Sequence, residues 1–152
     1  MRKTYQVLAY VLAAEVIVQA MAIAYALAAM GHWVDEDGGV VNKALFDADN
    51  PDFPGVGGFE LHGMNGMMLI PLVVLALVIT SFFSKVPDAP KRAGILFGMV
   101  ALQIVLGLSS HSVPWLAPLH VLNAFGIVTF AYLTGRRVTA EVPTTAPQTV
   151  PV

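Results

Sequence analysis

The sequence predicts an all-α integral membrane protein, a bundle of four transmembrane helices. Of its 152 residues, 57% are hydrophobic and only 12% are charged, whereas soluble domains carry roughly 25% charged residues. Four apolar runs lie at about residues 5–30, 62–84, 93–110 and 116–134. With their flanks, these runs are long enough to cross a hydrocarbon core of about 30 Å. Because lipid cannot satisfy unpaired backbone groups, each run is expected to be helical.

The basic residues predict the orientation of these helices. Seven of the eight lysines and arginines flank the runs on one side: Arg2, Lys3, Lys85, Lys91, Arg92, Arg136 and Arg137. Short loops rich in Lys and Arg face the cytoplasm, so both termini are expected there. The segment 31–60 is acidic apart from Lys43, and is predicted to be an extracytoplasmic loop. We therefore expect a multi-pass protein of the bacterial cytoplasmic (inner) membrane, with the lipid bilayer and no nucleic acid as its partner.

The first run and the loop after it contain polar features that need an explanation. Glu15 lies near the middle of the run, where an ionisable group is costly, and it is expected to face the bundle interior and bond a polar neighbour such as Gln103. The loop 31–60 is rich in Gly, Pro, Asp and Asn, which favour turns, and it also contains four large aromatic side chains. These aromatics favour either a lid that folds back onto the bundle or an aromatic belt at the membrane interface.

The later runs contain helix breakers and small residues. Pro71 removes a backbone donor inside the second run and predicts a kink there. Gly94 and Gly98 form a G-x-x-x-G pattern in the third run, a spacing that allows close helix approach. The segment 138–152 is poor in large apolar residues and repeats Pro and Thr, so it is predicted to be a disordered cytoplasmic tail.

Two similar hexapeptides open the second and fourth runs. Residues 61–66 read LHGMNG and residues 119–124 read LHVLNA, so each contains His and Asn three positions apart, on one helical face. The two runs point the same way, which places His62 and His120 at nearly the same depth. Gln19 and Gln103 match more loosely in the first and third runs. The pattern predicts two helical hairpins related by duplication.

The repeated histidines favour a haem site in the outer leaflet. Imidazole nitrogens are axial ligands of haem iron, and helix bundles build cofactor sites from side chains on facing helices. We expect His62 and His120 to hold the iron, while Gly66 leaves room for the macrocycle. Asn65 and Asn123 are expected to bond propionates or to orient the imidazoles. The remaining residues assigned to this haem b site are Gln19 and Gln103.

Other interpretations stay open at this point. A single histidine at a helix end is commonly a hydrated interfacial residue without a role. Copper is an alternative cofactor because His and Met both ligate it, although only Met68 returns near the His62 face. His32, His111 and Glu60 are weaker candidates for a metal or for supporting roles. A third interpretation is a non-enzymatic accessory subunit of a larger membrane complex, without a cofactor.

The polar positions Gln19, His62, Gln103 and the LHVLNA hexapeptide resemble a family of small four-helix bacterial membrane proteins of unknown function. More distantly, they resemble one four-helix half of haem A synthase, in which histidines at the outer ends of even-numbered helices ligate haem. The matching positions here are His62 and His120. This chain has a single half and no cysteine, so the resemblance implies haem binding rather than haem A synthesis.

These observations together predict a membrane b-type haem protein with one bis-His haem. We expect electron transfer or haem handling with a quinone or respiratory-chain subunits as partners, and no enzymatic activity of its own. Assembly as a homo-oligomer or within a membrane complex is compatible with the sequence. No catalytic residue is assigned.

Overall fold

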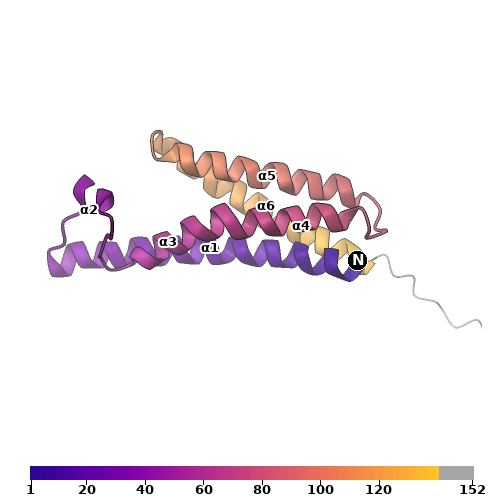
Figure 1. The fold of residues 1–152 in the computed structure, drawn as a ribbon, viewed down its shortest axis with the longest axis horizontal. Helices are drawn as coiled ribbons and strands as arrows, with labels where there is room; N and C mark the ends of the chain where they lie inside the picture. The colour runs from indigo at the N-terminus through magenta and orange to yellow at the C-terminus, as the bar shows by residue number, and fades with distance from the viewer. Residues whose placement is uncertain (141–152) are drawn as a thin grey trace, which may run out of the picture.

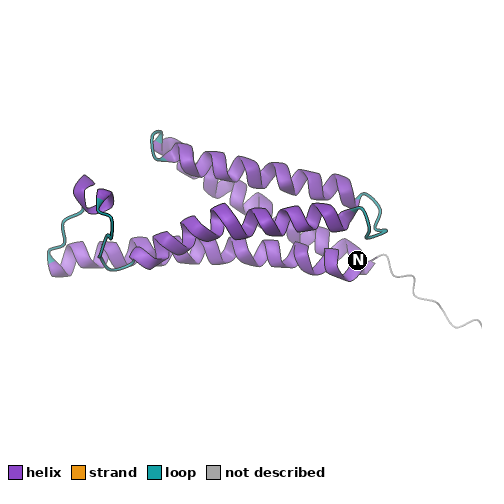
Figure 2. Ribbon diagram, viewed as in Figure 1, coloured by secondary structure: helices purple, strands orange, loops and turns teal. Residues whose placement is uncertain are grey.

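The computed structural model describes residues 1–140, and within them all regular secondary structure is helical, without β-strands (Figure 2). Four helices or helix series are long and apolar enough to cross a membrane: Arg2–Asp37, Val56–Ser81, Ala89–Ser110 and Pro114–Thr139. The prediction of an all-α protein with four helices that could cross a membrane is thereby confirmed. Of the predicted tail 138–152, residues 138–140 belong to the last helix, and the rest lies outside the described residues.

The second and fourth spans are composite, and a short helix interrupts the first connection (Figure 1). The elements in chain order are α1 (Arg2–Asp37), α2 (Lys43–Asp47), α3 (Val56–Met64), the π-helix η1 (Asn65–Leu69), α4 (Ile70–Ser81), α5 (Ala89–Ser110), the 3₁₀-helix η2 (Pro114–Leu116) and α6 (Ala117–Ala140).

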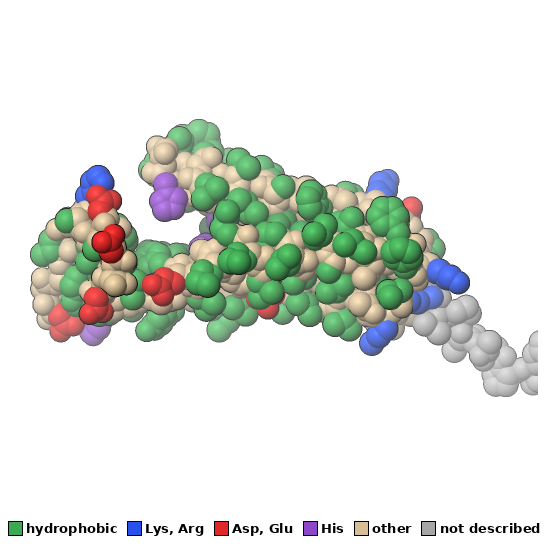
Figure 3. Space-filling view, in the orientation of Figure 1, with side chains coloured by type: hydrophobic (Ala, Val, Ile, Leu, Met, Phe, Trp, Pro, Cys, Tyr) green, Lys and Arg blue, Asp and Glu red, His purple; other side chains and the backbone are tan. Residues whose placement is uncertain are grey.

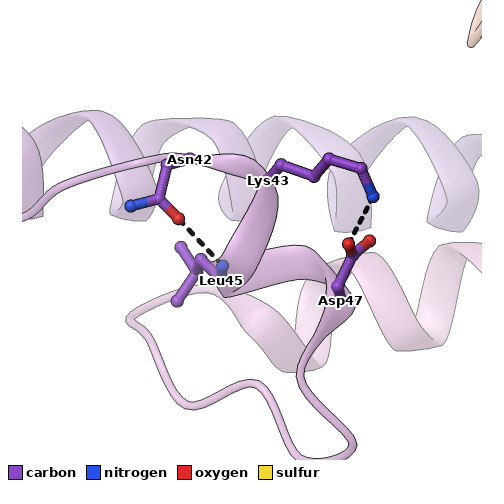
Figure 4. A network of polar contacts seen from close by, with 4 residues as sticks. All are labelled: Asn42, Lys43, Leu45 and Asp47. Atoms are coloured by element: carbon purple, nitrogen blue, oxygen red, sulfur yellow. Dashed lines mark hydrogen bonds and ion pairs between the residues drawn. The ribbon is translucent and has the colours of Figure 1, made fainter.

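The first connection is shorter than the predicted loop 31–60. Helix α1 continues to Asp37 and ends where Gly38 adopts a left-handed conformation with φ of 69°, the usual glycine stop of a helix. Helix α2 lies in this connection, and its first turn is capped by Asn42, whose side-chain oxygen accepts from the Leu45 N–H at 3.0 Å (Figure 4). Lys43 and Asp47 pair across its one turn.

The connection folds back onto α1 and α3. The Phe53 ring is 5% exposed and lies 5.8–6.3 Å, centroid to centroid, from the rings of Trp33, Phe46 and Phe59. A Cβ at Gly55 would lie 2.7 Å from the main-chain oxygen of Ala26. The aromatic residues therefore form one small cluster at the end of the first hairpin.

The two ends of the bundle differ in charge and in packing. We call the end with the N-terminus and the last turns of α6 the basic end and the end with α2 the acidic end, after the Lys/Arg and Asp/Glu that gather there (Figure 3). At the basic end α1 packs against α4 and α6, and α5 packs against α4 and α6. Long-range hydrogen bonds join these helices: Tyr5 donates to the Ala89 oxygen at 3.3 Å, and Gln6 donates to the Gly135 oxygen at 3.1 Å.

Toward the acidic end the two hairpins separate. Helix α3 packs chiefly against α1, and no side chain between residues 101 and 126 of the second hairpin is buried. Figure 1 shows α5 and α6 diverging from α1 and α3 in this direction, and Figure 3 shows histidine side chains in and beside the resulting notch. The bundle is thus closed at its basic end and open between the hairpins at its acidic end.

Two expectations for the helix interiors are modified by the structure. The irregularity near Pro71 is the π-helix η1, in which the Ile70 N–H bonds the Asn65 oxygen five residues earlier. Pro71 follows Ile70 and has no N–H to donate to a carbonyl of the preceding turn. A wide turn at this point therefore costs little, because that carbonyl would stay unpaired in a regular helix as well. Gly94 and Gly98 do not mediate close packing within the chain, since a Cβ at either would meet nothing within 4 Å.

Candidate functional site

The structure brings His62 and His120 together where the two hairpins begin to separate. His62 lies in the last turn of α3 and His120 in the first turns of α6. Their ring centroids are 6.2 Å apart, and the ring planes are inclined by 59°. Both side chains are partly buried. Two residues that are 58 positions apart in sequence therefore form one imidazole pair.

Each imidazole is oriented by a backbone carbonyl of the preceding long helix. His62 Nδ1 lies 3.1 Å from the Gln19 main-chain oxygen, and His120 Nδ1 lies 3.0 Å from the Gln103 main-chain oxygen. A carbonyl oxygen only accepts, so Nδ1 must carry the proton and donate in both bonds. In the neutral rings Nε2 is then unprotonated and keeps its lone pair. This is the arrangement seen in metal-ligating histidines, whose other nitrogen donates to a fixed acceptor.

The two asparagines support the helices rather than the imidazoles. Asn65 Nδ2 donates to Glu15 Oε2 at 2.9 Å, and Asn123 Nδ2 donates to Gln103 Oε1 at 2.7 Å and to the Met99 oxygen at 2.9 Å. The expectation that these asparagines orient the imidazoles is wrong, since backbone carbonyls do so. Glu15 does bond a polar neighbour, as expected, but this neighbour is Asn65 rather than Gln103.

The hydrogen bonds of the two hairpins correspond position by position, with one difference. Glu15 precedes Gln19 by four residues, as Met99 precedes Gln103, and in each hairpin the asparagine bonds the residue at that position. Asn65 reaches the carboxylate of Glu15, whereas Asn123 reaches the backbone oxygen of Met99 and the Gln103 amide. A side-chain carboxylate in the first hairpin thus replaces a main-chain acceptor in the second.

That difference leaves polar atoms unpartnered in the first hairpin. Gln19 and Asn65 are 8% and 7% exposed. Both amide atoms of Gln19, and Oδ1 of Asn65, are buried without a hydrogen-bond partner among the described residues. Buried amide groups without partners are costly, so this cluster is under-satisfied relative to its counterpart around Gln103.

Glycines shape the site differently from the expectation. A Cβ at Gly66 would lie 3.5 Å from Gln19 Nε2, in ordinary contact, so Gly66 lies against α1. Gly107 was not singled out from sequence, yet a Cβ there would lie 3.0 Å from His120 Cε1 and 3.2 Å from Nδ1. Its position one helical turn after Gln103 was the available signal. Gly107 therefore provides the space that the His120 ring occupies.

The remaining candidates do not join the histidine pair. His32 lies exposed within α1, His111 follows α5 and is exposed, and Glu60 is exposed in α3. None of these three makes a hydrogen bond or ring contact with a described residue. Met68 in η1 is 62% exposed, so it does not pack into the bundle. Within residues 1–140 no group of three or more His, Cys, Asp or Glu side chains is placed to hold a metal ion.

The described residues form an all-helical protein with four helices that could cross a membrane and a histidine pair where its two hairpins separate. Comparison of the chain with protein-family models, with curated proteins and with solved structures finds no match. The resemblances drawn from the sequence therefore stay predictions, and function has to be inferred from the site itself.

Proposed function

We propose that the protein binds one b-type haem between His62 and His120. The observation that carries the proposal is the imidazole pair, with ring centroids 6.2 Å apart and both Nδ1 atoms bonded to backbone carbonyls. The Nε2 atoms of His62 and His120, which keep their lone pairs when Nδ1 donates, would hold the haem iron. A structural role alone requires neither two matched tautomers nor their juxtaposition.

The residues present fit this group. Both rings are neutral-imidazole donors with one nitrogen bonded to a carbonyl, the chemistry that haem iron and other metal ions accept as a ligand. No side chain between residues 101 and 126 of the second hairpin is buried, and the two hairpins diverge toward the acidic end (Figure 1).

The protein's own groups would orient the ligands and set their environment. The Gln19 and Gln103 carbonyls hold the two rings, and Gly107 leaves room for the His120 ring. The haem, when bound, supplies one-electron chemistry. With a single site in one half of the membrane, electron exchange with a quinone or a respiratory subunit in that half, or haem handling, is the role that we infer.

We further propose that both termini are cytoplasmic and that the hairpins arose by duplication. Seven of eight basic residues gather at one end, which supports this orientation in a bacterial inner membrane. The matched pairs His62–Gln19 and His120–Gln103 support the duplication. The site would then lie in the outer leaflet.

The test is a visible spectrum of the protein purified in mild detergent, oxidised and reduced, before and after haemin addition. A Soret band with sharp reduced α and β bands is expected, and it should be lost in His62→Ala and in His120→Ala. His32→Ala and His111→Ala are matched controls, because each removes an exposed histidine outside the pair, and both should retain the spectrum.

Two outcomes would overturn the proposal. A colourless preparation that also fails to respond to haemin would favour an accessory subunit without cofactor. Stoichiometric copper in metal analysis, lost in His62→Ala, would favour the copper alternative.

A further inference from the structure

Two hollows that share lining residues lie along α5 and α6, and the second is lined by arginines; together we call them the groove. Its apolar part, of about 810 Å³, extends from Leu106 and Leu119 to Phe130 and Leu133. A second hollow, of about 360 Å³, shares Phe130 and Leu133 with the first and is otherwise lined by Arg92, Arg136 and Arg137. The shared residues make the two hollows one path from apolar wall to positive charge.

Three arginines, Arg92, Arg136 and Arg137, gather in the second hollow at the basic end. Among the described residues, none of them has an Asp or Glu oxygen within 4.0 Å, and Asp88 acts on Arg92 only at longer range. Arg92 is held in place, because its Nε donates to Thr134 Oγ1 at 3.1 Å and its guanidinium lies 4.5 Å from the Phe130 ring centroid. Its terminal nitrogens donate no hydrogen bond to a described residue, and the same holds for Arg136 and Arg137.

We propose that this groove binds an anionic phospholipid of the leaflet at the basic end. The guanidiniums would bind the phosphate, since Arg pairs with phosphate through two parallel bonds, and basic pockets between transmembrane helices bind such head groups. From Leu133 to Leu119 the α6 rise of 1.5 Å per residue gives about 21 Å. One leaflet contributes about 15 Å of hydrocarbon, so an acyl chain fits along the groove.

Other occupants fit the groove less well. A neutral quinone would leave the three guanidiniums without a counter-charge. A haem on His120 lies 16 residues from Arg136, about 24 Å along α6, too far for its propionates to reach the arginines. A second copy of this chain would cover the apolar wall but offers no described acidic group at the basic end other than Asp88. The lipid proposal is independent of haem binding.

The experiment measures lipid binding to the full chain in mild detergent, by native mass spectrometry and by the shift in thermal unfolding temperature. Phosphatidylglycerol is expected to bind and stabilise more than phosphatidylcholine, and inorganic phosphate at equal concentration to have no effect. Arg136→Gln with Arg137→Gln should weaken phosphatidylglycerol binding about fivefold per arginine, which corresponds to about 1 kcal/mol each. Lys85→Gln with Lys91→Gln removes the same charge at the same end outside the groove, and should leave binding unchanged.

A second pair of variants tests the apolar part without a change of charge. Thr129 lines the groove, so Thr129→Phe should fill it and weaken phosphatidylglycerol binding. Val121→Phe, on an exposed α6 position outside the groove, should not. Equal binding of the two lipids, an equal effect of the lysine and arginine pairs, or stabilisation by phosphate alone would overturn the proposal. A dimer that Thr129→Phe dissociates would assign the groove to a second copy instead.

Discussion

At the scale of single residues, Gln19 and Gln103 occupy equivalent positions with opposite hydrogen-bonding states. Both main-chain oxygens accept from a histidine. The Gln103 amide also accepts from Asn123, whereas the buried Gln19 amide has no partner among the described residues. The two glutamines differ in the hydrogen bonds of their side-chain amides and not in those of their main-chain oxygens. Side-chain substitutions therefore test the amide without removing the acceptor of the histidine.

Replacing each glutamine by methionine should therefore have opposite effects on stability. Gln19→Met removes two unsatisfied buried polar atoms at similar volume, and should raise the free energy of unfolding by about 1 kcal/mol. Gln103→Met removes one of the two acceptors of Asn123 and should lower the free energy of unfolding by about 1 kcal/mol. Thermal unfolding followed by circular dichroism in mild detergent measures both. Equal losses in the two variants would mean that the Gln19 amide is satisfied.

Gly107 is a second residue whose role is specific to the site. Gly107→Ala places a Cβ 3.0 Å from His120 Cε1, which forces the ring to shift, so haemin affinity should fall and the stability gain normal for Gly→Ala in a helix should be absent. Gly94→Ala is the matched control on the same helix, because its Cβ would meet nothing within 4 Å. It should stabilise the protein by up to about 1 kcal/mol and leave haemin titration unchanged.

At the scale of elements, η1 lets the second span pack against α1 through both α3 and α4, and against α5 through α4. Its one wide turn stands between α3, which packs on α1, and α4, which packs on α1 and α5. A π-turn contains one residue more than an α-turn. Each residue of a helix turns it by about 100°, so this extra residue offsets the faces of the two segments.

Deleting the extra residue should be tolerated in η1 and not in a regular helix. In a Pro71→Ala background, deletion of the exposed Met67 converts the wide turn to an α-turn and keeps both faces in register. The unfolding free energy should change by about 1 kcal/mol or less. Deletion of Leu75, a half-exposed residue of α4, rotates one part of the core outward and should cost about 3 kcal/mol or more. Similar losses from the two deletions, measured by thermal unfolding, would contradict this account of η1.

At the scale of the whole molecule, charge and packing are distributed along one axis. The basic end contains the closed core, and the acidic end contains the open space between the hairpins and the histidine pair. The absence of cysteine makes single introduced cysteines direct reporters of which end faces which side.

With both termini cytoplasmic, Ser112→Cys at the acidic end should react with a membrane-impermeant maleimide on intact bacterial cells that express the protein. Lys85→Cys at the basic end should react only after the cells are permeabilised. Both positions are exposed, so a difference in labelling reports topology rather than burial. The reverse pattern would invert the proposed orientation and place the histidine pair in the inner leaflet.

The sequence was sufficient for the features that depend on local composition. Four apolar runs determine four spans, because a lipid environment leaves the helix as the only way to satisfy the backbone of a single segment. The two hexapeptides with His62 and His120 could be read as equivalent because they open runs that point the same way. Helix ends were less accurate: α1 extends to Asp37, since polar residues continue a helix until Gly38 stops it.

Only the tertiary structure decided which groups meet. Three contacts depend on helix rotation and on the offset between neighbouring helices. Asn65 bonds Glu15, backbone carbonyls accept from the imidazoles, and Gly107 leaves the space for His120. The sequence of a helix shows which residues share a face, but it does not show which neighbouring helix that face contacts. The path from the apolar wall of α6 to three arginines arises in the same way, from residues of two helices that become adjacent only on packing.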